Sequence, residues 1–111
     1  MEDAIKGVGT RVKNKRKKLT IADIQQAVAN KYNVKLADLK GKSRKKEIVN
    51  PRQIAMYISR ELLDDSLVTI ANAFDRDHTT VIHGIDKITD LMDEDEELKN
   101  ELEALIKEIR D

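Results

Sequence analysis

The chain has 111 residues with no cysteine, one proline and four glycines, which fits one helical domain with a modest core and excludes disulfides and thiolate metal sites. We find no apolar run near the roughly 18 residues of a membrane span and no signal-peptide core, so a cytoplasmic protein is expected. The net charge of zero conceals an asymmetry: residues 1–60 hold 16 Lys and Arg against 5 Asp and Glu, whereas residues 61–111 hold 5 against 16. Such a basic half favours a polyanion partner.

The N-terminal segment, residues 1–18, contains two glycines and the run KNKRKK, and it shows little apolar periodicity. It is predicted to be a basic linker or arm that precedes a folded domain at residues 19–111. The first helix of that domain should open at Thr20, a good N-cap with Asp23 at the N3 position, and should end at Asn33.

A basic loop is predicted next. Val34 and Leu39 anchor a short turn or small helix, after which KGKSRKKE (residues 40–47) has five basic residues among its first seven. Gly41 and Ser43 interrupt any regular structure there, so the whole segment is expected to be a basic loop.

The sequence VNPRQI predicts the start of a long helix. Asn50 should be its N-cap, with Pro51 at the first helical position, where a missing N–H costs nothing. The helix is expected to run to about Leu63 and to carry Arg52 and Arg60 on its polar face.

The remaining residues predict three further helices. Ser66 should cap a short helix over residues 67–73, and a DRD turn then leads to a longer helix with apolar residues at 3.6-residue spacing. The acidic run DEDEE, residues 93–97, separates that helix from a final one. The chain is therefore predicted to be an all-α, compact bundle of about six helices that contains a helix-turn-helix and a basic loop.

The polar stretch DRDHTT, residues 75–80, stands directly before an apolar run. Catalysis and metal binding are not expected, because His78 and His83 diverge by about 140° on a helix and no serine has an evident base. No cofactor is expected, since the sequence contains no GxxxxGK[ST] phosphate loop. A plain helix cap would explain Asp77 but not the polar residues that follow it.

The surrounding helices favour a third interpretation, in which these side chains contact DNA. A short helix, a tight turn and a longer helix with a polar first turn form the layout of a helix-turn-helix, whose second helix enters the major groove N-terminus first. There His78 can donate to guanine, the methyl groups of Thr79 and Thr80 suit the thymine methyl, and Asp77 can accept from cytosine. The predicted partner is double-stranded DNA, with the basic half contacting its backbone.

The motif FDRDHTTVIHG and the stretch IQQAVANKYNVKLADLKGKSRKKEIVNPRQIAMYISREL resemble the DNA-binding domain of the bacterial DnaA replication initiators, over about residues 19–110. The resemblance implies an all-helical domain of the bacterial nucleoid that recognises asymmetric, A·T-rich initiator boxes at the replication origin. It implies base contacts from Asp77, His78, Thr79 and Thr80, a minor-groove contact from Arg44, phosphate contacts from Lys42, Lys45 and Lys46, and positions at the DNA face for Arg52, Gln53 and Arg60.

The sequence departs from the usual pattern of that family at three positions. Asp75 stands where glycine is usual, and aspartate tolerates a left-handed turn. Gly84 replaces an alanine, at a cost of ~1 kcal/mol in helix propensity, and Val68 stands where some relatives have proline. The family's ATPase domain is not in this sequence, so the chain by itself should neither oligomerise with ATP nor open strands, and it should bind DNA as a monomer unless joined to such a domain.

Two other functions remain open on the sequence alone. A DnaA-like domain can serve a stand-alone transcription regulator or a transposase-associated module, and a protein-interaction domain would use the acidic C-terminal helix as its contact surface. A salt titration separates DNA binding from protein binding, because the former weakens with a slope near −0.9 per neutralised phosphate. An anionic membrane is not an expected partner, since a membrane-surface helix needs exposed bulky apolar residues and the chain has only three aromatic ones.

Overall fold

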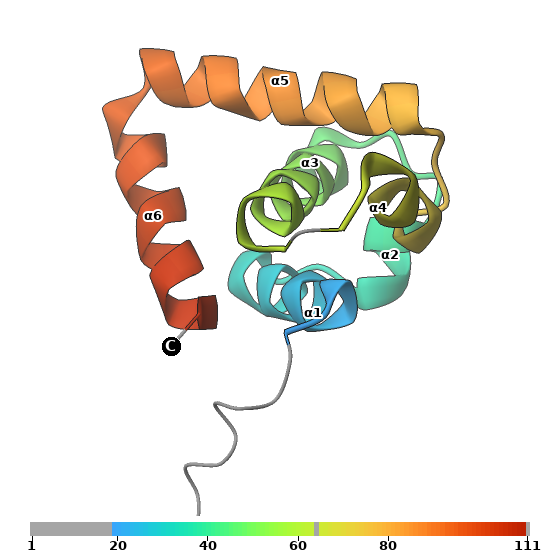
Figure 1. Ribbon diagram of the computed structural model, residues 1–111. Helices are drawn as coiled ribbons and strands as arrows, with labels where there is room; N and C mark the ends of the chain where they lie inside the picture. Colours follow the sequence, from blue (N-terminus) through green and yellow to red (C-terminus); the bar gives the residue numbers. More distant parts are fainter. Residues whose placement is uncertain (1–18, 64, 111) are drawn as a thin grey trace, which may run out of the picture.

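The computed structural model describes residues 19–63 and 65–110, and the predicted basic arm at residues 1–18 lies outside the described residues. The predicted all-α class and the number of helices are confirmed for the described part (Figure 1). No helix in that part is both long and apolar enough to span a bilayer. The helices in chain order are α1 (Ile21–Tyr32), α2 (Leu36–Lys40), α3 (Lys46–Leu62), α4 (Leu67–Ala73), α5 (His78–Glu94) and α6 (Glu96–Arg110).

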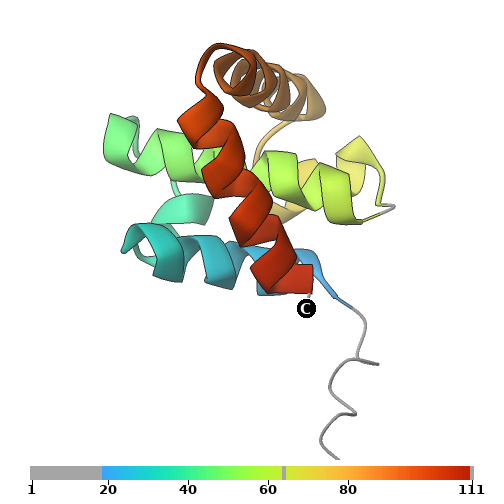
Figure 2. The same ribbon diagram turned by 90° about the vertical axis from the view of Figure 1, so that its left-hand side faces the viewer.

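Helix α3 is the centre of the bundle, and all the other helices pack against it. Helix α5 lies across one side of the domain, where it contacts α3 and α4, while α1 and α2 lie on the opposite side (Figure 1). Helix α6 turns back from the end of α5 and passes over α3 towards α1 (Figure 2). The amino end of α5 is therefore at the end of the domain where α4 and the α2–α3 connection also lie.

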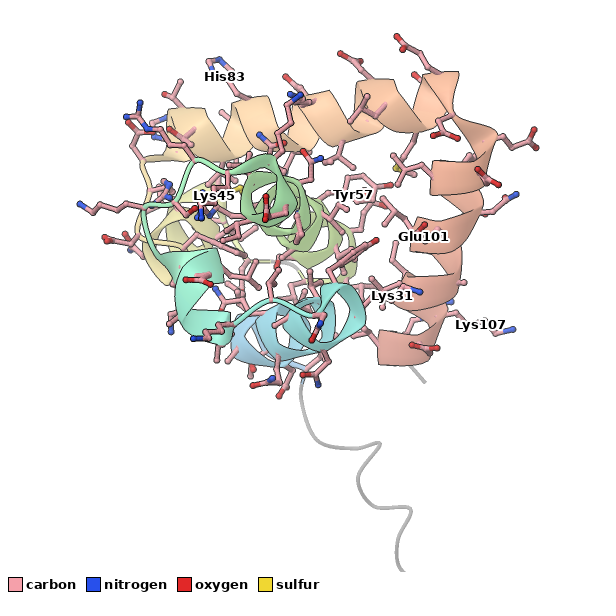
Figure 3. All side chains as sticks on the ribbon, turned by 180° about the vertical axis from the view of Figure 1, so that it is seen from behind. Lys31, Lys45, Tyr57, His83, Glu101 and Lys107 are labelled. Atoms are coloured by element: carbon pink, nitrogen blue, oxygen red, sulfur yellow. The ribbon has the colours of Figure 1, made fainter. Side chains whose placement is uncertain are left out.

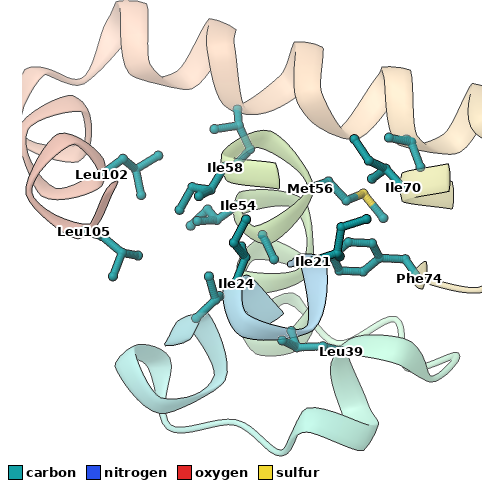
Figure 4. Close-up of a cluster of buried hydrophobic side chains, with 14 of the residues drawn as sticks. Ile21, Ile24, Leu39, Ile54, Met56, Ile58, Ile70, Phe74, Leu102 and Leu105 are labelled. Carbon is teal, nitrogen blue, oxygen red and sulfur yellow. The ribbon is translucent and has the colours of Figure 1, made fainter. Parts of the chain in front are cut away.

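The core consists of aliphatic side chains from all six helices and the ring of Phe74. Ile24 of α1, Ile58 of α3 and Leu102 of α6 are completely buried with Phe74 (Figure 4). Each such side chain contributes about 1.5–3 kcal/mol by leaving water. The predicted apolar face of α5 is confirmed in outline, although Ile85 is only half-buried.

Three of the predicted N-caps are confirmed by their hydrogen bonds. Thr20 Oγ1 accepts from Asp23 N at 3.2 Å while Asp23 Oδ2 accepts from Thr20 N at 3.0 Å, so the two form a capping box. Ser66 Oγ accepts the N–H three residues later at 3.1 Å, and Asp77 Oδ1 accepts from Thr80 N at 2.9 Å. Caps of this kind stabilise a helix by about 1 kcal/mol each, so local sequence sets where α1, α4 and α5 begin.

The predicted start of α3 at Asn50 is wrong, because the helix begins at Lys46. Its first turn is closed by hydrogen bonds from the N–H groups of Ile48 and Val49 to Lys45 O, at 2.9 and 2.8 Å. Pro51 therefore lies inside the helix, close to its amino end. Because proline has no N–H, α3 lacks one backbone hydrogen bond there. As a consequence the basic loop is shorter than predicted: it comprises residues 41–45, and Lys46 belongs to α3.

The turn between α4 and α5 is a Schellman motif. Arg76 N donates to Ala71 O at 2.9 Å and Asp75 N donates to Asn72 O at 3.2 Å, which satisfies two carbonyls at the end of α4. Asp75 adopts φ 55°, so the left-handed turn expected there is confirmed. The backbone is thus tightly fixed directly before the Asp77 cap.

A close approach between α3 and α5 occurs at Gly84, which is buried. A Cβ atom at this position would lie 3.2 Å from both Gln53 Cγ and Met56 Sδ on α3. The glycine that weakens α5 as an isolated helix therefore lets α5 lie close against α3.

Helix α6 is tied to α1 by a hydrogen bond in which the Tyr32 hydroxyl donates to Glu101 Oε2 at 2.5 Å. Glu101 lies on the side of α6 that faces the body of the domain (Figure 3). Burial, followed by this hydrogen bond to a carboxylate, raises the pKa of Tyr32 well above its usual value. The predicted break before α6 is confirmed at Asp95, whose Oδ1 accepts from Leu98 N at 3.2 Å.

The left-handed residue gives a direct test of the turn. We expect Asp75→Gly to raise the free energy of unfolding by up to about 1 kcal/mol, because glycine adopts this φ without strain. Asp75→Ala should lower it by about 1 kcal/mol, since alanine lacks the local hydrogen bonding that lets aspartate tolerate the region. Thermal denaturation followed by circular dichroism should rank the melting temperatures glycine, aspartate, alanine. Three equal melting temperatures would contradict the assigned backbone conformation.

Candidate nucleic-acid interface

The first turn of α5 presents the predicted base-contacting residues to solvent. Asp77, His78, Thr79 and Thr80 are all exposed, whereas the next residue, Val81, is buried and fixes the rotation of the helix. Hydrogen bonds from the Thr80 side chain and backbone, helped by His78, lower the pKa of the Asp77 carboxyl, so it is a carboxylate at neutral pH. The helix dipole at this end also favours an approaching anion.

The basic loop, residues 41–45, connects α2 to α3 beside that turn. Lys42, Arg44 and Lys45 are exposed, and so is Lys46 at the start of α3. Lys45 N donates to Ser43 Oγ at 3.3 Å, a weak local bond within the loop. The α2–α3 connection and the α4–α5 turn lie at the same end of the domain (Figure 1).

A hollow of about 430 Å³ separates the basic loop from the first turn of α5. Four of its lining residues are cationic and two are acidic, so its walls carry a net positive charge, and the chemistry suits an anionic group that lies between the two surfaces. The lining residues are Lys42, Ser43, Arg44, Val49, Arg52, Asp75, Arg76, Asp77 and Thr80.

Arg52 was predicted to lie on the exposed polar face of α3, and this prediction is wrong. The side chain is only 5% exposed and lines the hollow. Its guanidinium donates to Leu39 O at 2.9 Å, Ser43 O at 3.0 Å and Asp38 O at 2.8 Å. Burial, and then the nearby charge of Arg76, lower the pKa of Arg52, while Asp38 opposes this shift. The side chain holds the basic loop in place, because five N–H donors on one planar group can satisfy several carbonyls at once.

Arg76 has a similar role in the structure, and sequence reasoning missed it. From the α4–α5 turn it donates to Gly41 O in the basic loop and, at 3.1 Å, to Asp75 O. Only its position within the DRDHTT stretch marked it, and nothing in the sequence indicated a contact with a loop 35 residues earlier.

Three other residues from the predicted site lie away from the hollow. Lys46 borders a second hollow, between α1, α3 and α6. Arg60 is exposed near the opposite end of α3, with one long hydrogen bond of 3.4 Å to Asp65 O. Gln53 is half-buried beneath α5 beside Gly84, and its Oε1 is buried without a hydrogen-bond partner.

Metal binding finds no support in the described residues, 19–63 and 65–110, where no group of three or more His, Cys, Asp or Glu side chains could hold an ion. His78 is at the amino end of α5, whereas His83 points away from the body of the domain on the outer side of that helix (Figure 3).

Comparison with known proteins agrees with this geometry. Residues 21–88 match the family described as the bacterial dnaA protein helix-turn-helix. The chain is 50% identical over 98 residues to the chromosomal replication initiator protein DnaA of Oenococcus oeni, an alignment that covers 87% of this chain and 22% of that protein. It also resembles a crystal structure of a DNA replication initiation factor, with a TM-score of 0.75 and 37% identity over 81% of this chain and 28% of the other.

The match extends from α1 to the middle of α5 and so includes the basic loop, the α4–α5 turn and the hollow between them. The chain spans about a fifth of the length of the relative from Oenococcus oeni. With the family model covering most of the described residues, this chain belongs to the bacterial DnaA helix-turn-helix family.

Proposed function

We propose that this chain binds double-stranded DNA and recognises initiator boxes of the DnaA-box type at a bacterial replication origin. The observation that carries the proposal is that the exposed first turn of α5 and the basic loop lie on the two sides of one hollow. In B-DNA a single phosphodiester strand separates the major groove from the minor groove. A hollow with cationic walls between two polar surfaces suits that strand.

In this proposal the amino end of α5 enters the major groove. His78 donates to guanine, Thr79 and Thr80 contact thymine methyl groups or base edges, and Asp77 accepts from cytosine with the carboxylate oxygen that does not cap the helix. The backbone N–H of Thr80 caps the helix through Asp77 Oδ1, so the cap does not need Oδ2, which can accept from a base. Because Val81 is buried and the turn before Asp77 is fixed, the backbone that carries these side chains is already oriented before DNA is bound.

The basic loop then follows the phosphate strand into the minor groove. Arg44 enters that groove, which is narrow and strongly negative where it is rich in A·T pairs. Lys42 and Lys45 contact phosphates on either side, with Lys46 and Arg60 as more distant contributions. Arg52 holds the loop instead of contacting a phosphate freely, since its N–H groups already bond to three carbonyls.

The longer relatives suggest where such binding acts. One is named a chromosomal replication initiator protein, and the matched crystal structure is titled a DNA replication initiation factor. We therefore place this domain at the origin in the bacterial nucleoid, bound as a monomer to each box unless an attached ATPase domain brings copies together. The domain supplies recognition, not catalysis.

The first test separates base recognition from folding. Thr80→Ala should change the melting temperature little, because alanine keeps the backbone N–H that caps the helix and only an exposed side-chain contact with Asp77 is lost. It should remove about 1–3 kcal/mol of discrimination between a cognate box and a box changed at one contacted base pair. Affinity is measured by fluorescence anisotropy on both duplexes at one salt concentration. Thr89→Ala is the matched control, since Thr89 is exposed on the same helix and bonds only to Ile85 O. A folded Thr80→Ala protein with parental discrimination would falsify the role of Thr80 in base recognition.

A second test compares two neighbours in the basic loop. Arg44→Ala should weaken binding most on boxes with an A·T-rich flank, because its guanidinium responds to the narrow minor groove. Lys45→Ala should weaken binding to all duplexes about equally and should lower the salt slope by about one. Affinities for A·T-flanked and G·C-flanked boxes across a salt series give both quantities. Uniform losses in both variants would show that Arg44 is only a phosphate contact.

A further inference from the structure

The side chain of Arg76 connects the two surfaces that the proposed function assigns to different grooves. It belongs to the turn that immediately precedes the Asp77 cap, yet its guanidinium donates to Gly41 O in the basic loop. It neither caps a helix nor fills the core, since only its backbone N–H closes the turn. We propose that Arg76 is a positioning residue for Arg44, which fixes the minor-groove side chain relative to the first turn of α5. This inference rests on the proposed function.

The loop is held by hydrogen bonds at two positions shortly before Arg44. Arg76 bonds to the carbonyl of Gly41, and Arg52 bonds to that of Ser43, the residue directly before Arg44. The side chains between and after these points remain exposed. With two of its carbonyls fixed, the loop has little freedom to lose when DNA binds, and the direction in which Arg44 leaves the surface is set in advance.

The two anchors differ in what they attach the loop to. Arg52 fixes it to α3, in the body of the domain, whereas Arg76 fixes it to the turn whose Schellman hydrogen bonds set the start of α5. Arg76 therefore fixes the position of the basic loop relative to the first turn of α5. A one-residue link of this kind makes contacts in the two grooves depend on each other energetically.

The charges at the floor of the hollow also favour this assignment. Arg76 stands close enough to Arg52 to lower the pKa of that buried guanidinium. Two cations held together in the free protein repel each other, and an anion in the hollow between the loop and α5 relieves that repulsion. The anchored loop conformation is thus the one that a phosphate would stabilise.

A positioning role and a direct phosphate contact give different results. If Arg76 only contacts a phosphate, Arg76→Met weakens all duplexes alike, lowers the salt slope by about 0.9 and adds its effect to that of Arg44→Ala. If Arg76 positions Arg44, Arg76→Met removes the preference for an A·T-rich flank. It then has little further effect on that preference in a protein that already carries Arg44→Ala, because Arg44 is what it positions.

The experiment measures affinities of the parent, Arg76→Met, Arg44→Ala and the double variant for A·T-flanked and G·C-flanked boxes, together with melting temperatures. We expect Arg76→Met to reduce the flank preference as much as Arg44→Ala does, roughly tenfold, as for one lost hydrogen bond to a charged group. In the Arg44→Ala background its further effect on the flank preference should be below about twofold. Arg110→Met, which removes an exposed charge at the end of α6, is the matched control and should leave the preference intact.

A second variant acts on the accepting side of the contact in case Arg76→Met does not fold. In Gly41→Ala the new Cβ would lie 3.0 Å from Ala37 O, so the backbone around Gly41 must give by a few tenths of an ångström without any change in charge. The same loss of flank preference is expected. Parental preference in either folded variant, or additive losses in the double variant, would overturn the inference alone. A parent chain that prefers no box at all would overturn the proposed function, and the inference with it.

Discussion

One buried guanidinium holds the irregular part of this domain to its helices. Arg52 donates to the carbonyls of Asp38, Leu39 and Ser43, which belong to the end of α2 and to the basic loop. Without it these carbonyls would lose the guanidinium donors, and removing such a partner costs more than the bond itself contributes. Together with the bond from Arg76 to Gly41 O, this buried cation fixes the backbone beneath the exposed cations of the loop.

The two ends of α5 lie in regions of opposite charge. The basic loop and the amino end of α5 are at one end of the domain, and the carboxyl end of α5 leads into the acidic residues around Asp95. Helix α5 has 17 residues, so these ends are about 25 Å apart at 1.5 Å per residue. In the proposed complex the phosphates attract one end and repel the other. Although its net charge is zero, the chain is therefore expected to approach DNA with the recognition surface first.

Much of the fold was predictable because it depends on local patterns. The caps at Thr20, Ser66 and Asp77, and the bounds of α4, follow from short polar side chains placed directly before apolar periodicity. The start of α3 was not predictable in this way. Asn50 and Pro51 form a typical helix start, but the half-buried side chains before them extend the helix by another turn.

The candidate site also contains residues that local sequence predicts and residues that it does not. That Asp77 to Thr80 lie together on an exposed first turn is a matter of local sequence, and the structure agrees. The roles of Arg52 and Arg76 depend on backbone carbonyls 9 to 35 residues away, and a carbonyl is the same whatever the residue. Charge patterning therefore predicts that every arginine is a surface cation. In the structure Arg52 and Arg76 instead bond to backbone carbonyls of the basic loop.

In the proposed complex, two surfaces of one rigid domain occupy adjacent grooves of the same DNA site. Dimethyl sulfate tests this directly, because it methylates guanine N7 in the major groove and adenine N3 in the minor groove. Bound to a single box, the protein should protect guanines facing the first turn of α5 and, in the same complex, adenines of the neighbouring A·T-rich minor groove. Protection of guanine N7 with adenine N3 as reactive as in free DNA would contradict the account.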